Sequence, residues 1–337
     1  MQYRNLGRTG LKVSTLCLGS GSFESMISEE TARRVMQRAL DAGSNFFDTA
    51  DSYAHGESER FIGRVLKDTG QRDRVIISTK VFYPVGDGLN DQGLSRYHIL
   101  RACEASLRRL QTDHIDVYLT HHSASATIPI DETLGALTDL VRQDKVCYIG
   151  CSTHPAWEIM EALMVSQNKG YARYVVESSP YNLLDRRVEN ARIPLCQKYG
   201  LAVVLWSPLA MGMLAGRYPV DQPFPPSSRA AQDPQGIYAQ HINRRGLVAS
   251  ARVPEVAAQY GLTPGQASPL WLKDQPGITA PIVGPRNEEQ LAEMVTVADM
   301  HASDELRAAF DAIVPPGLAT SNFHNTSGWM KAGVWPD

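Results

Sequence analysis

The feature of this chain that most constrains its fold is a regular alternation of short apolar segments with longer segments of helical periodicity. Eight short segments have the apolar and β-branched character of buried strands. They span residues 13–19, 45–48, 75–79, 114–120, 146–151, 174–178, 201–207 and 278–284. Because a strand followed by a helix eight times implies parallel pairing, the pattern predicts an α/β fold, a single (β/α)8 TIM barrel over residues 1–337.

Local signals agree with this architecture. Ser28 stands where a helix N-cap is expected, and Gly43 stands where the same helix should stop. The Gly-Arg-Thr-Gly turn within residues 1–13 predicts a small N-terminal hairpin that caps the bottom of the barrel. Long connections at residues 83–93 and 216–247 follow strand C-terminal ends, where barrel enzymes place their binding loops. Residues 315–337 are expected to form a tail over the barrel mouth.

The main rival architecture is a doubly wound nucleotide-binding sheet. It requires G-x-G-x-x-G after the first strand, but the run here is GSGSFE, with Glu24 in place of the third glycine. The lysine-containing phosphate loop of the P-loop proteins is also missing from the sequence. If this chain binds a dinucleotide, we expect it to do so without the Rossmann fingerprint.

Charge and composition favour a small-molecule partner. The 337 residues include 33 Lys or Arg and 36 Asp or Glu, without a block of like charges that would attract nucleic acid or a membrane surface. The N-terminal residues lack the apolar core of a signal peptide, so we expect a cytoplasmic protein. Five cysteines without a C-x-x-C pair indicate neither a disulfide framework nor a zinc ribbon. A homo-oligomer is compatible with this composition.

Four polar residues lie at or just past the ends of three consecutive predicted strands. Asp48 and Tyr53 follow the second strand, Lys80 closes the third and His121 closes the fourth. Strand C-terminal ends meet at one mouth of a barrel, so residues far apart in sequence can share a site there. Each residue alone has an ordinary structural explanation, as a helix cap, a snorkelling lysine or a hydrogen-bonded histidine. Four such residues at the ends of three consecutive strands are much less expected by chance.

The four side chains together could deliver a proton to a carbonyl oxygen. A phenol ionises near pH 10, so a tyrosine is a poor acid at neutral pH unless a nearby cation stabilises the phenolate. Lys80 could supply that cation, and Asp48 could keep the ammonium charged and aimed. His121 could hydrogen-bond the substrate oxygen or share the proton with Tyr53.

Longer motifs around these residues carry a family resemblance. The sequence contains NFFDTADSY, the STK that ends the third strand, D-x-Y-x-x-H in the fourth, YNLLDRR, WSPLAMGMLAGRY and APIVGPRNEEQLAE. In this order they resemble the aldo-keto reductase superfamily, in particular the branch with bacterial sugar-aldehyde and aryl-alcohol reductases and potassium-channel β-subunits. The resemblance implies that Tyr53 is the proton donor and that Asp48, Lys80 and His121 complete a catalytic tetrad. It matches His121, rather than its neighbour His122, to the family position.

Strand parity distinguishes His121 from His122. Adjacent residues on a strand point to opposite faces, so only one of the two is expected to enter the mouth. His122 is therefore expected on the helix side or at the rim.

The same resemblance implies a nicotinamide dinucleotide across the barrel mouth. Trp206 would stack on the nicotinamide, and Ser152 and Thr153 would lie near the carboxamide. The remaining implied cofactor-binding residues are Ser178, Ser207, Leu209, Arg217, Arg229, Gly284, Arg286, Gln290 and Glu293. The guanidinium of Arg286 suits a 2′-phosphate, which favours NADP (NADPH) over NAD. The chain departs from the family pattern at Ser178, where a glutamine is usual, and at Met294, where an asparagine is usual.

The leading hypothesis is reversible NADPH-dependent reduction of an aldehyde or ketone, sugar-like or aromatic, to an alcohol. The alternative is a cofactor-binding, redox-sensing regulatory subunit with slow turnover. Metal-dependent hydrolysis is disfavoured, because no H-x-H follows the first strand and a lysine with a tyrosine is an unusual companion for a divalent ion. The substrate itself is left open.

Overall fold

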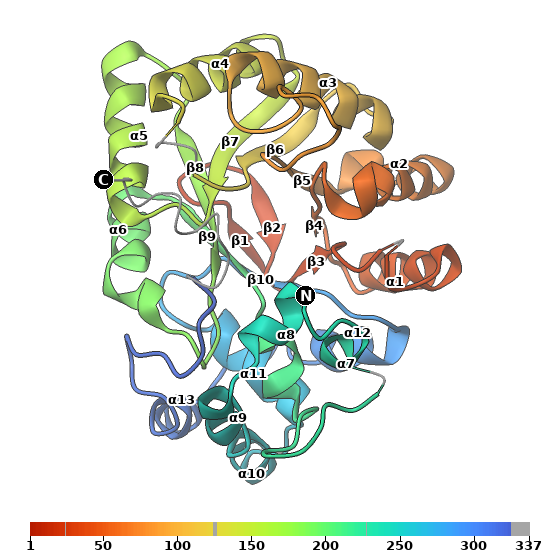
Figure 1. Ribbon diagram of the computed structural model, residues 1–337, viewed down its shortest axis with the longest axis vertical. Helices are drawn as coiled ribbons and strands as arrows, with labels where there is room; N and C mark the ends of the chain where they lie inside the picture. The colour runs from red at the N-terminus through yellow and green to blue at the C-terminus, as the bar shows by residue number, and fades with distance from the viewer. Residues whose placement is uncertain (24, 124–126, 227, 325–337) are drawn as a thin grey trace.

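Eight parallel strands close into a barrel in the computed structural model, which describes residues 1–23, 25–123, 127–226 and 228–324 (Figure 1). The order around the barrel is β10-β3-β4-β5-β6-β7-β8-β9. The strands are β3 (Cys17–Gly19), β4 (Phe46–Asp48), β5 (Ile76–Val81), β6 (Ile115–Thr120), β7 (Val146–Ser152), β8 (Tyr174–Pro180), β9 (Ala202–Trp206) and β10 (Ala280–Val283). The predicted (β/α)8 barrel is confirmed.

The first predicted strand differs from the expectation. Residues 13–19 divide into β2 (Lys12–Ser14), which belongs to the N-terminal hairpin, and β3, which opens the barrel. The backbone N–H of Thr15 donates to the carbonyl of Gln2 at 3.0 Å, still within the hairpin. The apolar pattern runs on without a break because Val13 and Cys17 are buried in the same core. Periodicity alone therefore did not reveal the turn between them.

The N-terminal hairpin is confirmed and packs against the bottom of the barrel. β1 (Tyr3–Asn5) pairs antiparallel with β2, and the turn between them contains Gly7. Gly7 has φ +57°, and a Cβ there would lie 2.6 Å from the backbone nitrogen of Ala202 at the start of β9. Only glycine permits both this conformation and this approach. Leu6 and Val13 close the lower end of the barrel interior with apolar side chains.

Helices surround the barrel and bury one face of each strand. They are α1 (Glu29–Asp41), α2 (Glu57–Thr69), α3 (Arg96–Leu110), α4 (Ile130–Arg142), α5 (Ala156–Lys169) and α6 (Arg192–Tyr199), with α11 (Pro264–Lys273) before the last strand. The predicted N-cap is confirmed, since the Ser28 side chain accepts from the Thr31 backbone N–H at 3.3 Å. α1 ends at the predicted place, and Gly43 follows with φ +84°.

Strand alternation decides which side chains reach the mouth. On β4, Phe46 faces the barrel interior and Phe47 faces the helix layer. Asp48 comes two residues after Phe46 and so faces inward, above the apolar filling of the barrel. The same parity carries Lys80 inward on β5. The lower barrel is therefore closed by apolar side chains, while its upper end is polar.

The long connection after β9 contains short helices. They are η4 (Ala210–Ala215), α7 (Arg229–Gln232), α8 (Ile237–His241), α9 (Arg244–Ser250) and α10 (Val253–Gln259), with α12 (Glu288–Val295) and α13 (Asp304–Asp311) following the barrel. Residues 315–324 run beside the segment after β8, where the Thr320 N–H donates to the Leu184 carbonyl at 2.8 Å. Residues 325–337 of the predicted tail lie outside the described residues. None of the helices in the described part of the chain is long and apolar enough to cross a bilayer.

Candidate active site

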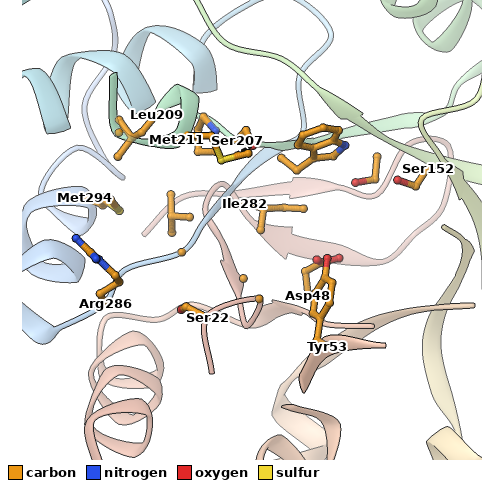
Figure 2. Close-up of a pocket in the computed structure, with 18 of the residues that line it drawn as sticks. Ser22, Asp48, Tyr53, Ser152, Ser207, Leu209, Met211, Ile282, Arg286 and Met294 are labelled. Atoms are coloured by element: carbon orange, nitrogen blue, oxygen red, sulfur yellow. Dashed lines mark hydrogen bonds between the residues drawn. The ribbon is translucent and has the colours of Figure 1, made fainter. Parts of the chain in front are cut away.

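A cavity of about 380 Å³ opens at the C-terminal ends of the strands (Figure 2). Its wall includes all four residues that the strand-end pattern brought together: Asp48, Tyr53, Lys80 and His121. They come from β4, the turn after β4, the end of β5 and the residue after β6. The convergence expected at a barrel mouth is therefore present, and we call these four side chains the mouth cluster.

A buried ion pair forms the base of the mouth cluster. The Lys80 ammonium donates to Asp48 Oδ1 at 2.5 Å and to the Thr49 carbonyl at 2.7 Å. The Lys80 side chain is 3% exposed and that of Asp48 is 5% exposed, so neither charge is solvated by bulk water. Burial acts to lower the pKa of Lys80, but Asp48 and Tyr53 outweigh it, and the pKa lies above its usual value. Lys80 is therefore a fixed cation at neutral pH.

Tyr53 is held over this cation by a tight turn. The ammonium lies 3.5 Å from the phenol oxygen and 5.1 Å from the centroid of the Tyr53 ring. Ala54 and His55, the next two residues, adopt left-handed φ values of 48° and 54°. Such a conformation is unfavourable for residues with a Cβ and is typical of functional sites. The turn directs the chain from β4 into α2 while leaving the phenol in the cavity.

His121 completes the cluster as a neutral imidazole. Its ring centroid lies 5.8 Å from that of Tyr53, edge to face at 72°. Burial, followed by the nearby charge of Lys80, holds the pKa of His121 well below 6.5. Its Nδ1 atom is buried and has no hydrogen-bond partner among the residues that the structure describes. A neutral ring with an unused polar atom suits a ligand that enters the cavity.

The expectation that only one of the two adjacent histidines enters the mouth is wrong. Both His121 and His122 line the cavity, and their rings stack at 5.2 Å with an interplanar angle of 10°. The parity rule fails because β6 ends at Thr120. The chain bends at both histidines, so strand alternation no longer fixes the directions of their side chains. The second histidine contacts Tyr83, another wall residue, which begins the long connection at residues 83–93.

Most of the residues assigned to cofactor binding share the same cavity. Its wall includes Ser152, Thr153, Ser178, Trp206, Ser207, Leu209, Arg217, Gly284, Arg286 and Gln290. Trp206 Nε1 donates to the Thr153 hydroxyl at 3.3 Å, which fixes the indole across the end of β9. The Ser178 hydroxyl is fully buried and lacks a hydrogen-bond partner in the described part of the chain. These residues line the cavity from the mouth cluster toward α12.

The comparisons with known proteins agree with this geometry. The model of the Aldo/keto reductase family matches residues 15–315. The chain belongs to the aldo/keto reductase family. The uncharacterized oxidoreductase YrpG of Bacillus subtilis (strain 168) is 37% identical over 335 residues, 95% of this chain and 98% of that protein.

Two plant relatives carry a different kind of name. A probable voltage-gated potassium channel subunit beta of Oryza sativa subsp. japonica is 36% identical, over 89% of this chain and 92% of its own. The protein of the same name from Arabidopsis thaliana is 34% identical, with the same two coverages. Family membership together with the similarity to an oxidoreductase identifies the general activity as that of an aldo/keto reductase.

One of the assigned cofactor residues does not join the cavity of this aldo/keto reductase. Glu293 is absent from its wall, and its carboxylate accepts a hydrogen bond from the Thr263 hydroxyl just before α11. On α12, Gln290 and Met294 face the cavity and lie one turn apart, which turns Glu293 toward α11. The side chain of Arg229 lies outside the described residues.

The sequence patterns also missed part of the wall of this aldo/keto reductase. The wall residues without a role assigned from the sequence include His122, Met211, Tyr218, Ser228 and Ile282. Most come from loops or from a strand face already assigned to the apolar core. The one signal available in the sequence was the length of the connections at 83–93 and 216–247, which supply Tyr83, Tyr218 and Ser228.

A strained segment forms the rim beside Trp206. Ser207, Ala210 and Met211 have φ values of 58°, 49° and 57°, and Gly212 has φ 100°. Three left-handed residues with a Cβ within five positions is an unfavourable arrangement that tertiary contacts must stabilise. Ser207 and Met211 lie in the wall (Figure 2). The backbone N–H groups of Ala210 and Gly212 donate within the segment, to the carbonyls of Ser207 and Leu209 at 3.0 and 2.8 Å.

Proposed function

We propose that this aldo/keto reductase uses NADPH to reduce an aldehyde or ketone to an alcohol, with Tyr53 as the proton donor. One observation carries the proposal. A single buried ammonium, Lys80, lies within reach of both the Asp48 carboxylate and the Tyr53 phenol, in a cavity with room for a ligand. An acid with its stabilising cation is the arrangement that carbonyl reduction needs.

The side chains divide the work of proton transfer. Tyr53 gives its proton to the carbonyl oxygen, and the phenolate that remains lies beside the Lys80 ammonium. Asp48 keeps that ammonium charged and in place, because an unpaired ammonium at this depth would tend to lose its proton. The neutral His121 ring lies edge to face with Tyr53 in the cavity wall and orients the substrate oxygen.

The wall residues fit a nicotinamide dinucleotide. The buried, unpartnered hydroxyl of Ser178 needs a polar partner, and a carboxamide supplies one. Trp206 offers a flat aromatic surface, fixed by its bond to Thr153, against which a ring can stack. The bound nicotinamide supplies the hydride that the carbonyl carbon accepts.

Arg286 supports the choice of NADPH. Its guanidinium has neither an ion-pair nor a hydrogen-bond partner in the described ranges, although its backbone N–H donates to Gln290 at 3.0 Å. It lies across the cavity from Tyr53 (Figure 2). A planar cation without a partner is matched to a 2′-phosphate, which NADP has and NAD lacks.

The proposal is tested by following NADPH absorbance with a panel of aldehydes and ketones. We expect Tyr53→Phe to lower kcat by about a thousandfold, the usual contribution of a general acid. NADPH binding, measured from the quenching of tryptophan fluorescence, should persist in the variant. Tyr97→Phe, on the exposed face of α3, is the matched control. A fully active Tyr53→Phe protein would overturn the assignment of the acid.

The names of the plant relatives motivate a second candidate function, a cofactor-binding regulatory subunit with slow turnover. The complete mouth cluster favours the enzyme, because a sensor has less need of a tuned acid. Turnover decides between the two. A regulatory subunit would oxidise NADPH very slowly with every carbonyl compound on the panel, whereas an enzyme would show rapid turnover with at least one.

A further inference from the structure

Three side chains of the kinds that bind metal ions meet at the end of the barrel opposite the cavity. His114 stands just before β6, Asp116 is the second residue of β6, and Cys147 is the second residue of β7. Each offers one ligand atom, and these atoms all lie within 4.8 Å of one another. The cavity opens at the C-terminal ends of the strands, whereas these residues lie at the N-terminal ends. We call them the bottom cluster.

The two strands bring the bottom cluster together from separate segments. His114 and Asp116 are two positions apart, so their side chains leave the chain on the same side. β6 and β7 are neighbours in the barrel, and Ile115 pairs with Val146 (Figure 1). This register places Asp116 beside Cys147. The grouping is a consequence of parallel pairing and has no counterpart in a short sequence motif.

The imidazole of the bottom cluster is already oriented for a metal ion. The Asp113 carboxylate is 2.7 Å from His114 Nδ1, so the outer nitrogen, Nε2, points toward Asp116. Nε2 lies 3.5 Å from Asp116 Oδ1. Two ligand atoms on one tetrahedral zinc ion, with bonds of about 2.0 Å, are roughly 3.3 Å apart. A carboxylate that holds the far nitrogen of a ligating histidine is typical of metal sites.

The carboxylate of the bottom cluster is fixed as well. Asp116 Oδ2 accepts from the Ile77 backbone N–H and pairs with Arg72, both at 2.9 Å. These contacts engage one oxygen and leave Oδ1 directed to the histidine. The Asp116 side chain is 11% exposed and that of His114 is 34% exposed, while Cys147 lies at the surface. An ion can therefore enter from solvent, and rotation of the cysteine side chain can bring its sulfur within bonding distance.

The charges around the sulfur favour a cation. The charges that act most strongly on the Cys147 thiol are those of Asp116, Arg72, Asp144 and Asp113. Three of these four groups are carboxylates, so the local charge is negative. A thiolate, an imidazole and a carboxylate are a donor set that zinc binds, with a fourth position left for water.

Another group with the same proximity, Cys151, His154 and Glu177, is less suited to a metal ion. Its Cys151 thiol donates to Glu177 at 3.0 Å, and His154 Nδ1 bonds the Ser152 carbonyl at 3.0 Å. All three residues are fully buried, so an ion would have to displace these bonds without a path from solvent. The bottom cluster has such a path.

We infer that His114, Asp116 and Cys147 bind a zinc ion, with a water molecule as the fourth ligand. As the zinc–sulfur bond forms, the Cys147 thiol releases its proton to solvent, and no group is oxidised or reduced. The ion ties the segment before β6 to the start of β7 and stabilises the bottom of the barrel. None of the three residues lines the cavity, so this inference does not depend on the proposed function.

Metal titration of the reduced, metal-free protein without a histidine tag tests the inference. We expect isothermal titration calorimetry to show one Zn²⁺ bound per chain, with micromolar or tighter affinity. Co²⁺ should give a thiolate-to-cobalt charge-transfer band and the intense visible bands of tetrahedral coordination. Zn²⁺ should also slow the alkylation of Cys147 in the folded protein, since the other four cysteines are buried.

Substitutions locate the ion. Cys147→Ser should abolish the charge-transfer band, and both Cys147→Ser and His114→Gln should weaken Zn²⁺ binding by about 100-fold or more. Asp113→Asn removes only the group that orients the imidazole, so we expect about a tenfold weaker affinity with the band retained. His301→Gln is the matched control, because His301 is also an exposed histidine beside a carboxylate, Asp274. It should leave Zn²⁺ binding unchanged.

Two results would overturn the inference. The first is a wild-type protein that binds neither metal ion, or that binds Co²⁺ without a thiolate band. The second is Zn²⁺ binding of wild-type strength in both Cys147→Ser and His114→Gln, which would place the ion at another site. Circular dichroism verifies that each variant is folded, and the cobalt spectrum of the wild-type protein tests the inference without any variant.

Discussion

Two clusters of buried polar side chains lie around the barrel strands, and they differ in whether their polar atoms have hydrogen-bond partners. The mouth cluster faces the cavity. A second group, which we call the outer cluster, consists of Cys151, His154, Glu158 and Glu177, all at most 1% exposed. Cys151 and Glu177 lie on β7 and β8, and Glu158 lies on α5. Both groups contain carboxylates and histidine at similar depth.

The outer cluster is a closed hydrogen-bonding network. The Cys151 thiol donates to Glu177 Oε2 at 3.0 Å, and the Ser179 hydroxyl donates to Glu177 Oε1 at 2.9 Å. His154 bonds the Ser152 carbonyl through Nδ1 at 3.0 Å and lies 3.5 Å from Glu158 through Nε2. Each ionisable member has a partner, and none of the four belongs to the cavity wall.

Strand alternation separates the two environments by a single residue. Cys151 and Ser152 are neighbours on β7, and so are Glu177 and Ser178 on β8, yet only the serines line the cavity. The Ser178 hydroxyl and His121 Nδ1 have no partner in the described residues, unlike the atoms of the outer cluster. Burial and charge therefore do not by themselves mark a functional site. Unsatisfied polar atoms that face an open cavity are the better sign.

The strongest test of this comparison is to remove the cation of the mouth cluster. Lys80→Met leaves Asp48 buried without its partner, so we expect about 3 kcal/mol of lost stability and roughly a thousandfold lower kcat/KM. The double variant Asp48→Asn with Lys80→Met should recover part of the stability and none of the activity. Urea unfolding and NADPH oxidation measure the two effects. If activity returned together with stability, Lys80 would be a structural residue.

The second largest effect is expected from replacing Arg286, which should change the preference between NADPH and NADH. We expect Arg286→Ala to weaken NADPH binding about 10- to 100-fold, the value of one or two charge-assisted hydrogen bonds, and to leave NADH binding nearly unchanged. Arg142→Ala, on the exposed surface of α4, is the control. Fluorescence titration with both dinucleotides measures the change. Equal losses of affinity for NADPH and NADH would show that Arg286 does not bind the 2′-phosphate.

Substitutions in the outer cluster should lower the stability of the fold and leave catalysis nearly unchanged. Glu177→Gln removes a carboxylate that accepts from Cys151 and Ser179, so we expect a loss of about 1–2 kcal/mol. The variant should keep kcat/KM within about threefold, although its neighbour Ser178 lines the cavity. Glu161→Gln, exposed on α5, is the matched control. A large kinetic loss at unchanged stability would show that the two clusters are coupled through β8.

The smallest expected effect is a pH dependence of stability from the cavity histidines. Burial holds the pKa of His121 and of His122 below 6.5 in the folded protein. Below pH 6.5 the unfolded chain therefore binds protons that the folded protein does not, and stability falls as pH falls. Each histidine contributes at most about 1.4 kcal/mol per pH unit. His122→Asn should flatten the change between pH 6.5 and 5.5 in urea unfolding, and an unchanged slope would contradict the assignment.

Much of the fold and of the mouth cluster could be predicted because the signals are local. The eight apolar segments predict the barrel. Ser28 and Gly43 indicate where α1 begins and ends, because helix caps depend on short-range geometry. Asp48, Lys80 and His121 reach one mouth because parallel strands must end on the same side. The break between β2 and β3 was missed because hairpin and barrel share one apolar core.

Tyr83 and His122 mark the limit of prediction from sequence. His122 was placed outside the mouth by a parity rule that holds only within a strand, and β6 ends two residues earlier. Tyr83 begins a long connection that was expected at the barrel mouth, but the connection has no periodicity that would predict the direction of the phenol. Glu293 was assigned through a motif, but the direction of its side chain depends on how α12 packs on α11.

The barrel, its N-terminal cap and the four residue types at the mouth follow from the sequence alone. Periodicity, turn chemistry and strand direction are properties of short segments. The tertiary structure decided which polar atoms were satisfied and which faced the cavity. Glu177 and Ser178 are adjacent in sequence, but one is enclosed by Cys151 and Ser179 and the other is left without a partner. Such differences depend on side chains brought together from distant segments. Short-range sequence patterns do not predict these contacts.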